Sequence, residues 1–167
     1  MGILRTFQRE LKGADWRTCV AGGLVALLLA GLACLIGGGS ASYAQLCGEC
    51  SPNFGKIWVI CRQCAAGLLG AAWGLYEGQC CTRNGWRKQG RIRWLSGMIS
   101  MLIWMVLFLS GGCEILSVLL YAWAIYSFIS AIEWFLRESL LSGVLLGSVV
   151  LWMMGNFLIS LRIILWN

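Results

Sequence analysis

Residues 94–135 read WLSGMISMLIWMVLFLSGGCEILSVLLYAWAIYSFISAIEWF, a long apolar stretch with a double glycine and Glu114 near its middle. One helix of this length would far exceed the roughly 20 residues that about 30 Å of hydrocarbon requires. The Gly-Gly step followed by an acidic residue is typical of a turn. We therefore expect two antiparallel membrane-spanning helices, at 94–112 and 114–135, joined by a tight connection.

Three further apolar runs, at 19–39, 57–77 and 140–161, have a similar length. Of the 167 residues, 59% are hydrophobic and only 12% are charged, whereas a soluble domain carries about twice that charged fraction. The runs are continuous rather than alternating, which favours helices over a membrane barrel. The sequence therefore predicts an all-α, polytopic transmembrane helix bundle of about five spans, with residues 19–167 as a single transmembrane domain.

Residues 1–18 have the pattern of a short amphipathic helix. Apolar side chains at helical spacing lie opposite basic ones, which predicts a helix at the membrane interface. The start Met-Gly-Ile-Leu-Arg-Thr also fits the N-myristoylation pattern at Gly2. An acyl anchor is redundant in a chain that spans the bilayer, so Gly2 is only a candidate for lipidation.

The basic residues predict the orientation of the bundle. If the N-terminus lies inside, ten arginines and lysines fall on the inner side and three on the outer side. This bias places the N-terminus on the cytoplasmic or matrix-equivalent side. The sequence does not choose among the mitochondrial inner membrane, Golgi or vesicle membranes and the plasma membrane. The basic residues behind the net charge of +6 are expected to set the orientation and to attract anionic lipids, and no binding to nucleic acid is expected.

Histidine is absent from the chain. Its absence removes the usual general base and the commonest metal and haem ligand. We therefore expect no enzyme activity, no catalytic residues and no redox cofactor. The small molecule that we expect to be bound is lipid.

Nine cysteines are many for this length, and four form two CxxC pairs, Cys47 with Cys50 and Cys61 with Cys64. Paired CxxC elements are typical of a structural zinc site or of stapling disulfides. Unpaired packing thiols are the third interpretation. Cys80 and Cys81 follow the second span beside a basic run, which makes them candidates for palmitoylation or a free reduced pair.

Small residues recur at the spacing that lets helix backbones approach closely. They are Gly70, Gly74 and Gly78 in the second span, Gly143 and Gly147 in the fifth, and Gly22, Ala26 and Ala30 in the first. Asn156 is a strong hydrogen-bonding side chain inside a span, and we expect it to bond a neighbouring helix. Arg62 lies in the first turns of the second span, from where its side chain is expected to reach the headgroups. Glu133 is expected to pair with Arg137 one turn later.

The second span ends Gly70-Ala-Ala-Trp-Gly-Leu-Tyr-Glu77-Gly-Gln-Cys80-Cys81. This ending resembles the second helix of the flower and Tvp18 family, small multispan membrane proteins of synaptic vesicles and Golgi membranes. The resemblance covers about residues 19–135 and implies that Glu77 matches a glutamate proposed to line a calcium pathway. The CxxC pairs and the fifth span have no counterpart in that family.

Two functions compete on this basis. The first is a non-catalytic membrane protein that acts by helix packing, as an accessory or structural subunit of a larger membrane complex or as a vesicle or Golgi trafficking component. Its partners are membrane lipids and other integral membrane subunits. The alternative is a cation channel or transporter subunit in which Glu77 forms part of a homo-oligomeric pore.

Overall fold

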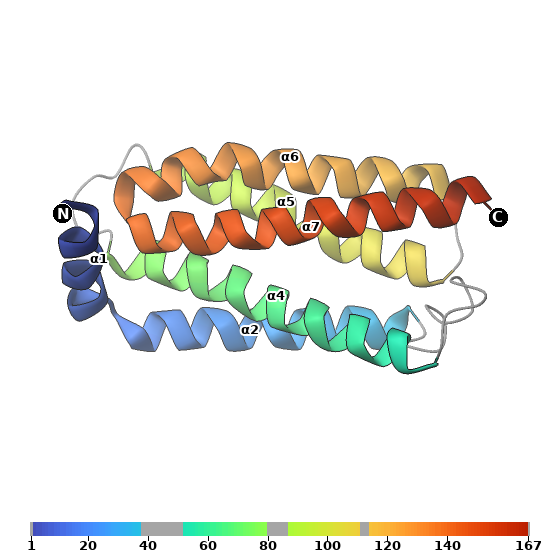
Figure 1. The fold of residues 1–167 in the computed structure, drawn as a ribbon, viewed down its shortest axis with the longest axis horizontal. Coiled ribbons are helices and arrows are strands. Elements are labelled where there is room, and N and C mark those ends of the chain that lie inside the picture. The colour runs from blue at the N-terminus through green and yellow to red at the C-terminus, as the bar shows by residue number, and fades with distance from the viewer. Residues whose placement is uncertain (1, 38–51, 80–86, 111–113, 167) are drawn as a thin grey trace.

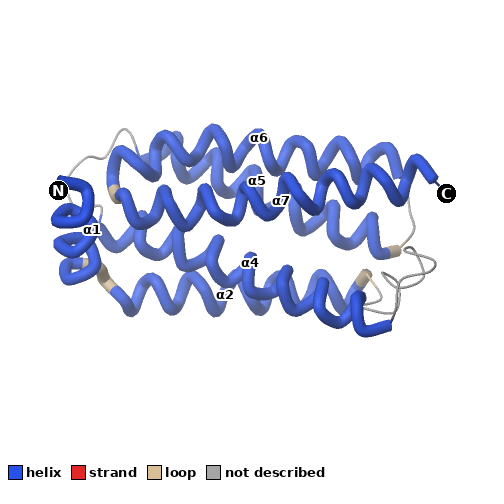
Figure 2. The backbone as a smooth tube through the Cα atoms, viewed as in Figure 1, coloured by secondary structure: helices blue, strands red, loops and turns tan. Residues whose placement is uncertain are grey.

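The computed structural model describes residues 2–37, 52–79, 87–110 and 114–166. Six helices make up the described chain, and no strand occurs among these residues, so the all-α prediction is confirmed (Figure 2). The helices are α1 (Gly2–Gly13), α2 (Trp16–Ile36), α4 (Pro52–Gln79), α5 (Arg87–Leu109), α6 (Glu114–Glu138) and α7 (Leu140–Trp166).

Five of these helices are long and apolar enough to cross a membrane, which confirms the predicted number of spans. The segments concerned are Trp16–Ile36, Lys56–Gly78, Gln89–Leu109, Ile115–Glu138 and Leu140–Leu161. The chain is therefore an integral membrane protein. Helix α1 is shorter and is not among these five segments, so its predicted place at the membrane interface stays a prediction.

The first span begins earlier than the predicted residue 19, because Asp15 caps α2. Its side chain accepts a hydrogen bond from the backbone N–H of Arg17 at 3.1 Å, and Thr18 Oγ1 donates to the Asp15 carbonyl at 2.9 Å. A side-chain acceptor at this position satisfies one of the backbone donors that a helix start leaves without a partner. The cap fixes the start of α2 at Trp16.

The five long helices run side by side, and α1 lies across one end of the bundle (Figure 1). We call this end the α1 end. Helix α2 packs along α4, while α6 packs against both α5 and α7, and α7 also contacts α4. The two termini lie at opposite ends of the bundle, as an odd number of crossings requires (Figure 1).

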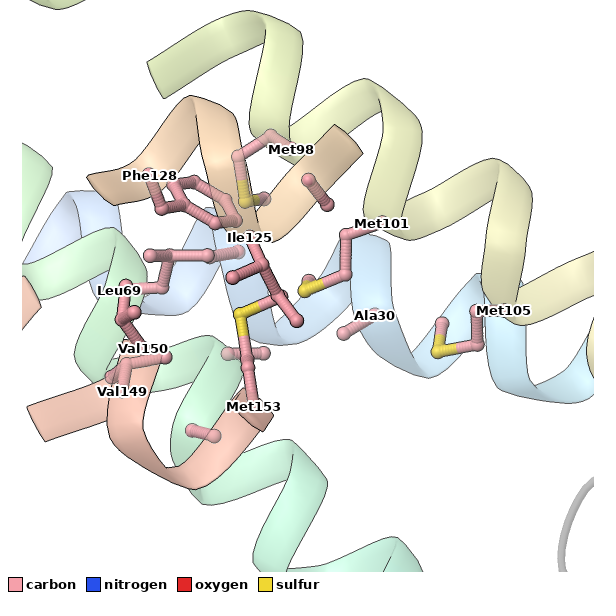
Figure 3. Packing of buried hydrophobic residues seen from close by; sticks show 14 of the residues in the cluster. Ala30, Leu69, Met98, Met101, Met105, Ile125, Phe128, Val149, Val150 and Met153 are labelled. Atoms are coloured by element: carbon pink, nitrogen blue, oxygen red, sulfur yellow. The ribbon is translucent and has the colours of Figure 1, made fainter. Parts of the chain in front are cut away.

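The bundle is held by a core of apolar side chains from all five spans. Phe128, Leu69 and Met153 are completely buried, and Met98, Met101 and Met105 fill the space between helices (Figure 3). Methionine suits this place because its unbranched side chain adapts to irregular gaps. Trp104 of α5 stacks on Tyr121 of α6 with ring centroids 4.1 Å apart.

Helix α2 contacts α5 at the end away from α1. A Cβ built on Gly37 would lie 2.7 Å from Leu109 Cβ and 3.3 Å from the Met105 carbonyl oxygen, so the two chains approach closely there. The side of α2 that faces away from the bundle is apolar and exposed, with Leu28 at 73% and Leu35 at 77%. In a bilayer such a surface is stable against lipid or another helix.

Candidate functional site

Glu77 lies in the last turns of α4 and is bonded to Arg91 of α5. Arg91 Nε donates to Glu77 Oε1 at 2.6 Å, and Arg91 Nη2 donates to Glu77 Oε2. Two N–H groups of one guanidinium thus hold both carboxylate oxygens, a geometry that fixes orientation as well as charge. The pair joins consecutive helices at the α1 end.

This pairing bears on the proposed ion pathway. The side chain of Glu77 is 23% exposed and that of Arg91 is 44% exposed, so the pair sits at the edge of the bundle. A cation ligand in a pore has to present its oxygens to the ion. Both oxygens of Glu77 are instead occupied by the guanidinium, and the carboxylate charge is compensated within the chain.

Glu77 also lines a groove between α2, α4 and α5. The groove has a volume of about 510 Å³ and is almost entirely apolar, with Glu77 and Thr18 as its polar members. Trp73 of α4 and Trp94 of α5 form part of its wall, and their rings stack with centroids 4.4 Å apart. The volume lies within the range of about 300–1,000 Å³ that is typical of small-molecule sites.

Helices α2 and α4 pack closely together beside this groove, and Gly22 and Gly74 also line it. A Cβ built on Gly70 would lie 2.1 Å from the Gly22 carbonyl oxygen, and one on Gly74 would lie 2.2 Å from the Thr18 carbonyl oxygen. Thr18 Oγ1 also donates to the Gly74 carbonyl at 3.0 Å. The small residues of the first and second spans therefore lie against each other, and α2 is held within backbone contact of α4.

The remaining glycines of the predicted packing rows differ. A Cβ on Gly78 would lie 2.5 Å from Thr18 Oγ1, and one on Gly143 would lie 2.4 Å from Leu136 Cδ2, so both sit in close contacts. A Cβ on Gly147 would meet nothing within 4 Å. Gly147 therefore has no close neighbour within the described part of the chain.

Glu10 ties α1 to the start of α7. Its carboxylate accepts hydrogen bonds from Ser139 Oγ at 3.1 Å and from the backbone N–H groups of Leu140 at 3.1 Å and Leu141 at 2.9 Å. A negative charge at a helix N-terminus is stabilised by the free N–H groups and by the helix dipole. Ser139 is the single residue between α6 and α7, and it caps α7 by accepting from Ser142 N at 3.2 Å.

No protein-family model matches the chain, and no match was found among curated proteins or among solved structures. The resemblance of residues 19–135 to the flower family stays a prediction.

Arg62 is buried in the half of the bundle away from α1, and the expectation that it reaches the headgroups is wrong. It is 4% exposed, and its guanidinium carbon lies 4.6 Å from the centroid of the Trp58 ring. Trp58 Nε1 in turn donates to Asn156 Oδ1 of α7 at 2.9 Å. The electron-rich face of the indole attracts the buried cation, an interaction worth about 0.5–2 kcal/mol. Asn156 thus bonds a neighbouring helix.

The structure describes only two of the four cysteines in the predicted CxxC pairs. Cys61 and Cys64 are exposed on α4 with free thiols, so the disulfide prediction is not supported at these two positions. Within the described ranges, no three cysteine or acidic side chains gather closely enough to hold a metal ion. The other cysteines of these predictions, Cys47, Cys50, Cys80 and Cys81, lie outside the described residues. Gly2 is the first residue of α1.

Sequence reasoning missed the partners of two acidic residues. Arg91 follows Glu77 by fourteen positions, across the connection between consecutive antiparallel helices. Opposite charges at the same end of adjacent helices are a usable signal for such a pair. Glu10 gave no comparable signal, because its partners are 129 to 131 residues away and two of the three are backbone groups. The pair of Glu133 with Arg137 is present, at 2.5 Å.

Proposed function

We propose that this chain is a non-catalytic integral membrane protein that acts by helix packing, as an accessory subunit of a larger membrane complex. The observation that carries this proposal is the bidentate pair of Glu77 with Arg91. Arg91 occupies Glu77, the acidic side chain that is best placed for ion binding or proton transfer. The described spans therefore act through the packing of their apolar surfaces against other helices.

The exposed face of α2 supports the role of a subunit. This helix touches the bundle through its small residues, while its larger side chains point outward; Leu24 is 55% exposed and Leu32 is 57% exposed. A peripheral helix of this kind offers a long apolar surface to a neighbouring membrane protein. By the charge bias of the sequence, we propose that the α1 end faces the cytoplasm or its organellar equivalent.

Two other roles remain as alternatives to this proposal. A vesicle or Golgi trafficking component is supported by the resemblance to the flower family. A cation channel would need Glu77 to leave Arg91 and face an aqueous path in an oligomer. The ion pair weighs against the channel, since breaking it exposes two charges near the hydrocarbon edge.

The test is the composition of the native particle. A tagged chain is extracted from its membrane in mild detergent, and the mass and the protein content of the particle are measured. We expect a second integral membrane protein in a fixed ratio to this chain. A homo-oligomer that conducts cations in vesicles, with flux lost in Glu77→Gln and kept in Glu133→Gln, would support the channel instead. Glu133 is the matched control because it is an acid paired to an arginine outside the groove.

A further inference from the structure

The groove between α2, α4 and α5 has the length of one leaflet. Its lining on α2 runs from Thr18 to Leu29, which is about 16 Å along a helix at 1.5 Å per residue. Half of the hydrocarbon thickness of a bilayer is about 15 Å. The groove therefore extends from the α1 end to about the middle of the membrane, as an acyl chain in that leaflet does.

The two ends of the groove differ in polarity. Its wall is apolar along Val25, Met98 and Ile99, while Glu77 and Thr18 lie toward the α1 end. An occupant that matches this pattern has a long apolar part and one polar end. A phospholipid has this shape, whereas a second transmembrane helix would continue past the middle of the bilayer.

The charge at the polar end favours an anionic headgroup. Among residues 5–18, 73–78 and 89–95, six are basic and three are acidic. The three acids already accept hydrogen bonds within the chain: Asp15 caps α2, Glu10 caps α7 and Glu77 binds Arg91. Basic residues near a membrane surface attract anionic lipids.

Trp94 supplies a second and independent observation. Its indole is 8% exposed and lines the groove, and its Nε1 has no hydrogen-bond partner among the described residues. A buried donor without an acceptor is unfavourable, so such groups usually have one. Trp94 lies one helical turn from Arg91, at the depth where tryptophan meets the ester region of the bilayer. The nitrogen itself is covered by protein atoms, so an ester or phosphate oxygen of a lipid supplies the acceptor once the ring turns toward the groove.

We propose that the groove binds one anionic phospholipid from the leaflet at the α1 end. One acyl chain lies along Val25 and Met98, and the headgroup lies beside Arg17 and the Glu77–Arg91 pair. This binding does not depend on the proposed accessory role, because the groove is built within a single chain.

The experiment measures lipid retention by the purified, delipidated chain in mild detergent. Phosphatidylglycerol and phosphatidylcholine with identical acyl chains are titrated separately, and bound lipid is counted by native mass spectrometry. Val25→Trp fills the groove, and Leu24→Trp is its matched control: Val25 is 56% exposed and Leu24 is 55% exposed, but only Val25 lines the groove. Circular dichroism confirms that each variant keeps its helix content.

We expect one phosphatidylglycerol on the wild type and on Leu24→Trp, and binding weaker by about tenfold or more in Val25→Trp. Phosphatidylcholine should bind about fivefold more weakly than phosphatidylglycerol, and Arg17→Gln should remove most of that difference. Trp94→Phe keeps an aromatic ring but loses the N–H, and should weaken binding of phosphatidylglycerol by about fivefold.

Equal retention by Val25→Trp and Leu24→Trp would overturn the proposal. Equal binding of the two lipids by the wild type would overturn the assignment of an anionic headgroup. If Val25→Trp lost a co-purifying protein and kept its lipid, the groove would hold a partner helix, and the lipid proposal would again be overturned. If the particle contained no second protein but still bound phosphatidylglycerol, only the accessory-subunit proposal would fail.

Discussion

The contact of α2 with α4 gives the sharpest test of the fold, through the substitution Gly70→Ala. A Cβ at this position would lie 2.1 Å from the Gly22 carbonyl oxygen and 2.6 Å from Ala26 Cβ. Favourable contacts of carbon begin at about 3.5 Å. The two helices must therefore separate by more than about 1 Å, because the nearest atoms are backbone or a methyl group with no rotamer to change.

The expected effect follows from two opposing terms. Overpacking of a close contact typically costs about 1–3 kcal/mol. Alanine in place of glycine in a helix interior contributes about 0.5–1 kcal/mol of stability in the other direction. Because the nearest atom is a backbone oxygen that cannot repack, the overpacking cost should lie in the upper half of its range, and the net loss for Gly70→Ala is then about 1–2.5 kcal/mol. For a protein of this size, such a loss lowers Tm by roughly 2–10 °C.

Thermal unfolding in detergent, followed by circular dichroism, measures this change. Gly147→Ala is the matched control, because a Cβ at Gly147 meets nothing within 4 Å. Its Tm should stay constant or rise by a few degrees, as the helix propensity of alanine alone would give. If Gly70→Ala were as stable as Gly147→Ala, the close approach of α2 and α4 would be refuted.

Three more predictions concern single contacts. Glu10→Ala removes the acceptor that ties α1 to α7, so amide hydrogen exchange in the first turn of α7 should become faster by about fivefold, the effect of a lost helix cap; unchanged exchange would contradict the contact. Asn156→Leu removes the acceptor of the Trp58 N–H and should lower the free energy of unfolding by about 1–3 kcal/mol, with a smaller loss when Trp58→Phe is already present. Cys61 and Cys64 should both react with maleimide before reductant is added; protection that reductant removes would restore the disulfide interpretation.

The number of spans was predictable because hydrocarbon sets the length of each apolar run. The division of 94–135 into two helices, α5 and α6, followed from the same argument, since one helix of that length has no bilayer to match it. The start of α2 was missed by three residues, because Asp15 acts through a hydrogen bond that hydropathy does not register. At α2 the polar cap, rather than the end of the apolar run, decides where the helix begins.

The burial of individual side chains was harder to predict than the spans. In a soluble helix the apolar stripe marks the buried face, but these spans are apolar on every side, so the periodicity carries little information. Arg62 shows the consequence: its depth in the span was predicted, but the rotation of α4 turns it inward against Trp58. The small-residue rows of the first and second spans predicted a close helix contact correctly, because only small side chains let backbones approach, whereas Gly147 of the fifth span has no such contact in the described part of the chain.

The same small residues decide both the stability of the bundle and the shape of the groove. Gly22 and Gly74 hold α2 against α4, and both also line the groove. Gly37 holds α2 against α5 at the end away from α1, while the stacked Trp73 and Trp94 occupy the space at the α1 end. The shape of the groove is therefore set by the packing of helices within the chain. Substitutions at its glycines should change unfolding and lipid retention together, whereas Val25→Trp on the outer wall should change lipid retention alone.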